Sequence, residues 1–238
     1  MRLYGKNPVL ERIRRAPETI KKLYLQQRTD LSRIVRAAKD VGLDFESVTR
    51  ERLEIESKGA HAQGVVAVID KYHYVSFPQM LNDAEKNKCI PVFLDGITDP
   101  QNLGSIIRTF ACLGGFSIVL SEHGAVNVNE TVLRVASGGE NSVNVSRVAN
   151  IATAIKKAKM KGFRIIGADA EAKCLVSDVK LRLPTAIVIG AEGKGMRPGV
   201  KKCLDEALKL PMDGADLSYN ASVAAALFCY VVKKRIGK

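Results

Sequence analysis

The hydrophobic positions of the first 70 residues predict a small unit of helices and strands. Residues 20–26 alternate apolar and polar side chains in the manner of a strand, and residues 64–70 form a compact run of mainly β-branched side chains. A helix capped by Asn7 precedes the first strand, and a second helix, capped by Asp30 and running to about Val41, follows it. The pattern is typical of a small α/β domain.

From Cys89 onward, short apolar runs alternate with amphipathic segments. The apolar runs predict strands at 90–95, 116–120, 163–169, 185–190 and 207–212. The amphipathic segments between them predict helices at 103–113, 130–136, 151–161 and 218–235. Nearly continuous apolar strands separated by helices indicate a mostly parallel sheet that helices cover on both faces. Because ligands of such sheets bind at the carboxyl ends of the strands, we expect functional residues at the strand-to-loop junctions.

A polar stretch separates these two regions. The chain has 238 residues, enough for one large domain or two small ones. Between residues 73 and 88, the FPQM segment can start a short helix and the following NDAEKNK is polar. We therefore predict an α/β protein with a small N-terminal domain at 1–72, a linker at 73–88 and a larger C-terminal domain at 89–238.

The net charge favours one class of partner. The chain carries 37 basic and 25 acidic residues, a net charge of +12, and such an excess favours polyanions, with nucleic acid as the first expectation. An enzyme of small molecules whose basic charge is incidental is the alternative. The positive charge is spread along the chain without a lysine-rich tail, so nucleic acid would bind to a folded surface.

Composition also bears on compartment and metal content. An apolar fraction of 46% argues against a chain disordered throughout, and no apolar run approaches the roughly 20 residues of a membrane helix. The charged N-terminus lacks the apolar core of a secretory signal. Five scattered cysteines without a CxxC pair, and three isolated histidines, predict free thiols and no metal. We expect a cytoplasmic protein that uses neither a membrane nor a metal.

The first junction, 94–109 (LDGITDPQNLGSIIRT), joins a strand to a helix. Asn102 is predicted to be the N-cap of that helix, and Arg108 lies two turns into it. Taken by themselves, these residues are an ordinary cap and an ordinary surface charge.

The second junction, 187–199, ends a β-branched strand in the order GxxGxG. Glycines at such a place let the backbone approach a ligand closely or adopt a positive φ. The order differs from the dinucleotide fingerprint GxGxxG, and the GK[ST] of a phosphate loop is missing. Glu192, flanked by Gly190 and Gly193, either contacts a cationic ligand or accepts hydrogen bonds from loop amides.

The third junction, 208–234, leads through a Gly/Asp loop into the final helix. The start of that helix, predicted near Ser218 with a serine cap, is rich in small and hydroxyl side chains. These permit close backbone packing, or a helix end that faces a ligand. GxSxG, HExxH and EF-hand patterns are absent, and the three junctions contain no histidine, which argues against a Ser–His–Asp hydrolase.

Together, the three junctions resemble the signature motifs of the SpoU (TrmH) family of RNA ribose 2′-O-methyltransferases in the SPOUT superfamily. NLGSIIRT resembles the first motif, IGAEGKGM the second and LPMDGADLSYNASVAAAL the third. The stretches LYGKNPVLERI and HAQGVVAVI resemble the L30e-like substrate-binding domain of the bacterial 23S rRNA guanosine methyltransferase branch. The third motif departs from the usual SLNVS, since Tyr219 and Ala221 replace aliphatic residues near the expected cofactor.

The resemblance implies a fold, a cofactor and partners. The C-terminal segment would thread through a loop to form a deep trefoil knot, with S-adenosylmethionine bound in a bent shape between the second and third motifs. The chain would form a homodimer with active sites near the subunit interface, and its substrate would be RNA, with a guanosine of 23S rRNA as the first expectation. The cofactor contacts implied are Gly190, Gly193, Leu210, Met212, Tyr219 and Ala221.

The resemblance also implies a catalytic set, which comprises Arg108, Asn102, Glu192, Ser218 and Asn220. Arg108 would activate the ribose hydroxyl. Because a guanidinium rarely gives up its proton, an electrostatic clamp on the 2′-oxygen and the adjacent phosphate is a more economical role than that of general base. A tRNA ribose methyltransferase of the same family and an RNA-binding protein without catalysis are the alternatives.

Overall fold

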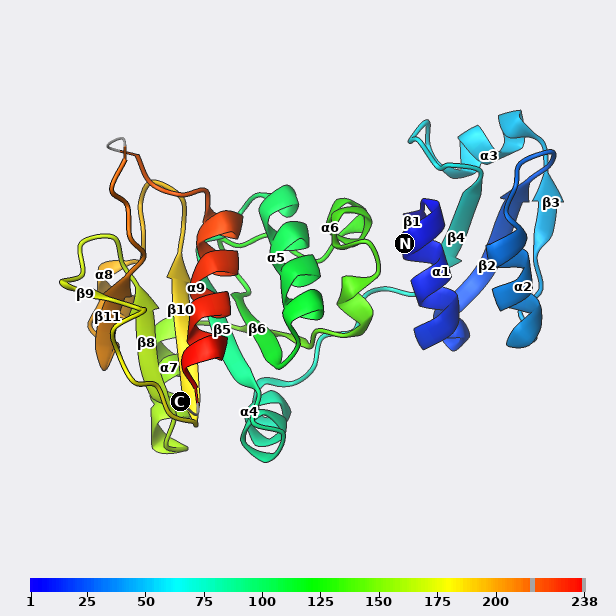
Figure 1. The fold of residues 1–238 in the computed structure, drawn as a ribbon. Helices are drawn as coiled ribbons and strands as arrows, with labels where there is room; N and C mark the ends of the chain where they lie inside the picture. Colours follow the sequence, from blue (N-terminus) through cyan, green and yellow to red (C-terminus); the bar gives the residue numbers. More distant parts are fainter. Residues whose placement is uncertain (215–216, 237–238) are drawn as a thin grey trace.

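Two α/β units, each built on its own sheet, make up the protein (Figure 1). The computed structural model describes residues 1–214 and 217–236. The predicted fold class is confirmed, with a small N-terminal unit beside a larger one whose sheet is parallel. Within the described ranges, the helices are all too short or too polar to cross a membrane, and acidic, cysteine and histidine side chains do not gather into a group that could hold a metal ion.

The N-terminal unit is a four-stranded sheet with helices on both faces. Its described elements are β1 Arg2–Tyr4, α1 Lys6–Arg15, β2 Ile20–Gln26, α2 Ser32–Asp40, β3 Glu46–Val48, α3 Arg50–Glu56 and β4 Val65–Ile69. The strand order is β1-β4-β2-β3, in which β4 is antiparallel to both neighbours and β3 is parallel to β2. Helices α1 and α2 pack with Leu23 and Ala67 on one face, and α3 packs with Tyr24 and Val66 on the other.

The first helix begins two residues earlier than its predicted cap allows. Gly5 occupies the N-cap position with a φ of +99°, a conformation that favours glycine, so the chain turns directly from β1 into α1. Asn7 therefore lies inside the helix and is not its cap. The prediction for Asp30 is also off by one residue: Leu31 is the N-cap of α2 and makes no side-chain cap hydrogen bond, while the carboxylate of Asp30, one residue earlier, accepts from the backbone N–H of Ser32 at 3.1 Å.

The described residues of the C-terminal unit form a seven-stranded parallel sheet. Its order is β7-β6-β5-β10-β8-β11-β9. The elements are α4 Phe77–Lys86, β5 Ile90–Asp95, α5 Pro100–Leu113, β6 Phe116–Ser121, α6 Glu130–Ala136, β7 Val145–Val148, α7 Ile151–Met160, β8 Arg164–Ala168, β9 Cys174–Leu175, β10 Thr185–Gly190, α8 Pro198–Lys201, β11 Glu206–Lys209 and α9 Ala221–Arg235.

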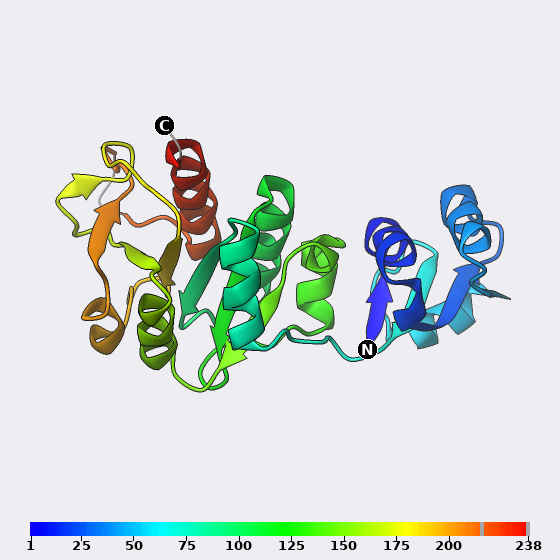
Figure 2. The same ribbon diagram turned by 90° about the horizontal axis from the view of Figure 1, so that it is seen from below.

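Successive residues of the central strands face opposite layers of helices. Val92 and Leu94 of β5 join the apolar cluster that contains α5, α6 and α9, whereas Phe93 joins the cluster that contains α4, α7 and α8. Figure 2 shows α5 and α9 on one side of the sheet and α7 and α8 on the other. Both faces are thus covered, which explains why these strands are apolar at nearly every position.

The predicted linker at 73–88 contains a packed helix. Helix α4 fills most of that stretch, and it buries Phe77, Met80, Leu81 and Ala84 against the sheet. These residues recur at helical spacing, so the polar NDAEKNK sequence forms the outer face and the end of a helix instead of a loose connection. The bounds of 1–72 and 89–238 remain our proposed division into domains, with α4 attached to the second.

Two predicted caps are corrected by the structure. Helix α5 begins at Pro100 with Asp99 as its cap, because the Asp99 carboxylate accepts from the backbone N–H of Gln101 at 2.9 Å, so Asn102 lies in the first turn. Helix α9 begins at Ala221, and Asn220 caps it where Ser218 was predicted to do so. In each case the N-cap is another polar residue, two or three positions away from the predicted one.

A buried ion pair joins the two units. Nη2 of Arg12, on α1, lies 3.0 Å from Oε1 of Glu140, and the two side chains are 10% and 0% exposed. Burial raises the pKa of the Glu140 carboxyl, and Arg12 opposes that rise. Nε of Arg12 and Oε2 of Glu140 have no hydrogen-bond partner among the described residues.

Removing one member of this pair is expected to cost more stability than removing both. Arg12→Met or Glu140→Leu leaves a buried charge without its partner, so each should lower the free energy of unfolding by about 3–5 kcal/mol. The double variant Arg12→Met/Glu140→Leu should lose less than either single variant, which urea unfolding at pH 7 will measure. Additive losses in the double variant would contradict a direct coupling.

Candidate active site

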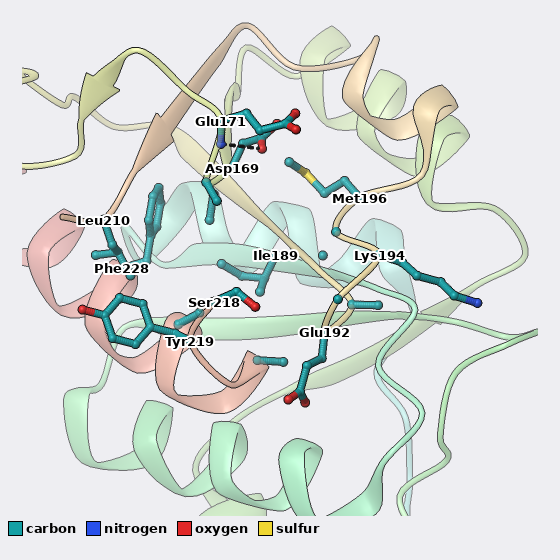
Figure 3. A pocket seen from close by; sticks show the side chains of 18 of the residues that line it. Asp169, Glu171, Ile189, Glu192, Lys194, Met196, Leu210, Ser218, Tyr219 and Phe228 are labelled. Carbon is teal, nitrogen blue, oxygen red and sulfur yellow. Dashed lines mark hydrogen bonds between the residues drawn. The ribbon is translucent and has the colours of Figure 1, made fainter. Parts of the chain in front are cut away.

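A pocket opens at the carboxyl ends of β8, β10 and β11, the edge at which the parallel sheet was expected to bind a ligand (Figure 3). Its volume is about 250 Å³. Ile189, Leu210 and Phe228 form an apolar wall, and the loop 190–196 supplies backbone groups opposite that wall. The pocket thus suits a ligand with one flat apolar part and one polar part.

The glycines of the second motif shape one side of this pocket. A Cβ atom at Gly190 would lie 2.3 Å from the carbonyl carbon of Gly195, so a side chain there is excluded. Ala191 and Gly195 exchange two backbone hydrogen bonds, of 3.1 and 2.8 Å, which close the loop. Gly193 and Gly195 have φ values of +72° and +64°, which favour glycine. The GxxGxG order therefore has a backbone cause at each glycine.

A buried carboxylate anchors the end of that loop. Oδ2 of Asp95 accepts from the backbone N–H of Arg197 at 2.8 Å, and Oδ1 accepts from Nε of Arg197 at 2.7 Å. The side chain of Asp95 is fully buried at the end of β5, next to β10. In the sequence, Asp95 is the last residue of the strand predicted at 90–95, and no motif singles it out. An aspartate that directly follows five apolar strand residues was the available signal for this role.

The third motif forms the facing wall and contacts the second. Nδ2 of Asn220 donates to Oε2 of Glu192 at 3.2 Å, and Oδ1 of Asn220 accepts from the backbone N–H of Ser222 at 2.9 Å. The hydroxyl of Tyr219 donates to the carbonyl of Pro211 at 3.1 Å. This hydrogen bond links the segment before α9 to the segment that follows β11. The carboxylate of Glu192 thus accepts from a side-chain amide of the third motif, which is neither of the two contacts expected for it. Ala215 and Asp216, within this motif, lie outside the described residues.

Eight of the predicted site residues line this one pocket. They are Gly190, Glu192, Gly193, Leu210, Met212, Ser218, Tyr219 and Ala221. Asn220 contacts the pocket through its hydrogen bond to Glu192. The resemblance places a cofactor between the second and third motifs, and both line one pocket although α8 and β11 separate them in the sequence.

Arg108 and Asn102 lie elsewhere in the described part of the chain. Arg108 is exposed on α5 and lines a separate cavity of about 350 Å³, together with residues of α1 and of 136–142. Asn102 is half-buried in the first turn of α5, and neither residue is among those that line the pocket in Figure 3. A single chain therefore assembles the second and third motifs and leaves the arginine of the first motif outside them.

An ionic cluster at the rim was missed from the sequence. Nζ of Lys201 lies 2.8 Å from Oδ2 of Asp169 and 3.5 Å from Oε2 of Glu171, and all three residues line the pocket. The hydrogen bond to Asp169 raises the pKa of Lys201 above its usual value. These residues belong to no recognisable motif, and they come together because β8 lies between β10 and β11, the two strands that flank α8 in the sequence.

Comparison with known proteins identifies the class as RNA methyltransferases. Residues 89–230 match the SpoU rRNA Methylase family, and residues 2–75 match the family described as RNA 2′-O ribose methyltransferase substrate binding. The chain belongs to the SpoU rRNA Methylase family. Because this family is S-adenosylmethionine-dependent, the predicted methyl donor is confirmed, and the chain is an RNA methyltransferase.

Named relatives match over nearly their whole length. The putative TrmH family tRNA/rRNA methyltransferase YacO of Bacillus subtilis is 36% identical over 97% of this chain and 94% of its own. The 23S rRNA (guanosine-2′-O-)-methyltransferase RlmB of Bordetella pertussis is 34% identical over 99% and 98%. Among solved structures, the SpoU methyltransferase AviRb of Streptomyces viridochromogenes, crystallised with AdoMet, has a TM-score of 0.82 at 22% identity, covering 99% of this chain and 90% of that one. This last likeness shows the fold.

Proposed function

We propose that the protein transfers a methyl group from S-adenosylmethionine to a ribose 2′-hydroxyl of 23S rRNA, on a guanosine, in the cytoplasm. The observation that supports this best is the convergence of the second and third motifs on one pocket at the carboxyl edge of the sheet. Full-length similarity to a relative named as a 23S rRNA guanosine methyltransferase supports the choice of nucleotide.

The pocket fits the methyl donor. The absence of a side chain at Gly190, where a Cβ would strike Gly195, lets the loop 190–196 close on itself and form a wall of the pocket. We propose that Leu210 and Met212 contact the adenine side, while loop 190–196 and the backbone at Tyr219 and Ala221 offer polar groups. S-adenosylmethionine supplies an electrophilic methyl group on a sulfonium centre.

In the proposed reaction, the residues of this chain position an alcohol, whose proton passes to water as its oxygen takes the methyl group, and they stabilise the charge that develops on that oxygen. Arg108 holds the 2′-oxygen and the neighbouring phosphate through its planar fork of donors. Ser218 and Asn102 orient the ribose, and the Glu192–Asn220 contact fixes the two loops. Preorganised donors of this kind typically supply the largest part of such rate enhancements.

The position of Arg108 leads us to propose a homodimer. One chain holds the pocket and the arginine apart, so the complete site requires an arginine from a second copy. Val223, Leu227 and Tyr230 of α9 recur at helical spacing and are 44%, 40% and 50% exposed. An apolar stripe on a helix next to the pocket suits a self-complementary, two-fold contact.

Our proposal includes the knot expected from the family, and the bridge between Leu181 and Ile236 supports it by placing the end of the chain beside an earlier loop.

A transfer assay tests the proposed function. The purified protein is incubated with methyl-labelled S-adenosylmethionine and with transcripts of 23S rRNA or tRNA, and the methylated position is mapped by mass spectrometry. We expect 2′-O-methylguanosine in 23S rRNA. Label in tRNA would replace the proposed substrate by the tRNA alternative. RNA binding without label on any transcript, including ribosomal precursor particles, would favour the non-catalytic reading.

A further inference from the structure

A cavity at the seam between the two units and a neighbouring cavity of the N-terminal unit share two arginines. The cavity that contains Arg108 is also lined by Arg14 of α1 and Arg33 of α2. A second cavity, of about 470 Å³, is lined by Arg14, Arg33 and Arg36. Because Arg14 and Arg33 line both cavities, the two form one groove, which runs from α2 across α1 to the exposed face of α5. We call this the seam groove.

The side chains of the seam groove suit a polyanionic backbone. Four arginines contribute positive charge, against the carboxylates of Glu11 and Asp40. Arginine presents a planar fork of donors that matches phosphate oxygens. No aromatic side chain is found among the described residues that line either cavity. A stacking platform for bases is thus missing from these walls, whereas stacking is the usual device for holding unpaired bases.

Glycine contacts hold the two walls of the seam groove together. A Cβ atom at Gly138 would lie 2.5 Å from Cβ of Glu11 on α1, and one at Gly139 would lie 3.1 Å from Cα of Arg108. The segment 138–139 therefore lies tightly between α1 and α5. The Arg12–Glu140 ion pair joins the same helix to the next residue of that segment. These contacts fix Arg14 relative to Arg108 before any ligand binds.

We propose that the seam groove grips the RNA backbone through Arg14 and Arg33, and that these two arginines deliver the target ribose to Arg108. They are positioning residues that read phosphates and not bases. The inference rests on the proposed function and adds to it a path for the substrate. Arg14 is available for this role because its partner Glu11 forms an exposed pair at 3.3 Å, and such pairs are weak enough for a phosphate to replace.

The test measures steady-state methyl transfer and RNA binding for Arg14→Ala and Arg33→Ala. Each should raise KM for RNA by about three- to tenfold with little change in kcat, because a charge-assisted contact to a phosphate is lost. The slope of log affinity against log salt should fall by about 0.7–0.9 for each phosphate contact removed. The loss of affinity should be the same for RNAs of different sequence, since phosphates carry no base information.

Two further variants serve as controls. Arg15→Ala removes the same charge from the next residue of α1, which is exposed and does not line either cavity, so it should leave KM and the salt slope nearly unchanged. Glu11→Gln removes a negative charge from the groove while keeping the side-chain size, so it should lower KM for RNA. A gain in affinity of this kind is not produced by a folding defect.

The outcomes separate this inference from the proposed function. If the wild-type protein transfers methyl groups but Arg14→Ala and Arg33→Ala match Arg15→Ala in KM and salt slope, the seam groove is not the RNA path. Losses that depend on base sequence would also overturn it, because base recognition would then be at work. Binding of RNA by wild type without transfer would instead count against the proposed activity, and the binding data would still test the groove.

Discussion

Replacing Arg108 by alanine is expected to abolish methyl transfer while leaving the affinity for S-adenosylmethionine close to that of the wild type. The guanidinium is assigned to the developing charge on the ribose oxygen, and loss of one such donor typically lowers kcat by about 10²–10³-fold. Because Arg108 does not line the pocket of its own chain among the described residues, cofactor binding should persist. Single-turnover transfer and calorimetry with the cofactor measure the two effects separately.

Mixing variants tests whether Arg108 acts across a homodimer. Arg108→Ala chains keep an intact pocket, and Gly190→Ala chains keep an intact arginine, so only a dimer of one with the other has a complete site. Random re-association should restore about a quarter of wild-type activity, because half of the dimers are mixed and each has one complete site. No recovery between two folded, exchanging variants would place Arg108 and the pocket in the same chain. Full activity of Arg108→Ala by itself would remove this residue from the mechanism.

The central strands of the parallel sheet were predictable because the pattern of apolar residues in their sequences matches the burial of those residues. Strands β5 and β10 are covered on both faces, so their sequences are apolar at nearly every position and stand out. The short strands β1 and β3 and helix α3 were missed, since three to seven residues give too few repeats of any period. Most of helix α4 was predicted to be a linker, because the polar residues of NDAEKNK lie between and after its buried positions and hide their helical spacing.

The candidate site was predictable in part, because the resemblance placed a cofactor between the second and third motifs but did not indicate other groups that shape the pocket. The resemblance supplied Gly190 and Tyr219 as neighbours of a cofactor, and both line the pocket. Gly104, in the first motif, has a packing reason that no motif states, since a Cβ there would lie 2.6 Å from Cβ of Val135 on α6. The roles of Asp95 and Lys201 depend on which strands become neighbours, and strand order is a tertiary property that periodicity does not encode.

Among pocket residues, Gly190 should tolerate substitution least. In Gly190→Ala the new Cβ would lie 2.3 Å from the carbonyl carbon of Gly195 and 2.4 Å from the backbone nitrogen of Met196. Both contacts are to backbone, so the loop must move as a whole and give up the paired hydrogen bonds between Ala191 and Gly195. We expect the affinity for S-adenosylmethionine to fall at least ~100-fold, which corresponds to about 2.8 kcal/mol, as measured by calorimetry.

Two matched glycine variants show which property of position 190 matters. Gly199→Ala, on α8, places its Cβ in open space at a helical position, so both cofactor affinity and thermal stability should be preserved or improved. Gly193→Ala also meets no neighbour but has a φ of +72°, so it should cost about 1 kcal/mol through backbone strain in the same loop. The loss of cofactor affinity should therefore be largest for the variant at 190, where the new Cβ strikes backbone, and smaller for the variant at 193, where only backbone strain is added. The variant at 199 has neither defect and should show no loss. If Gly190→Ala bound the cofactor as tightly as Gly199→Ala, the closed loop would not form the cofactor wall, and the assignment of this pocket to the methyl donor would fail with it.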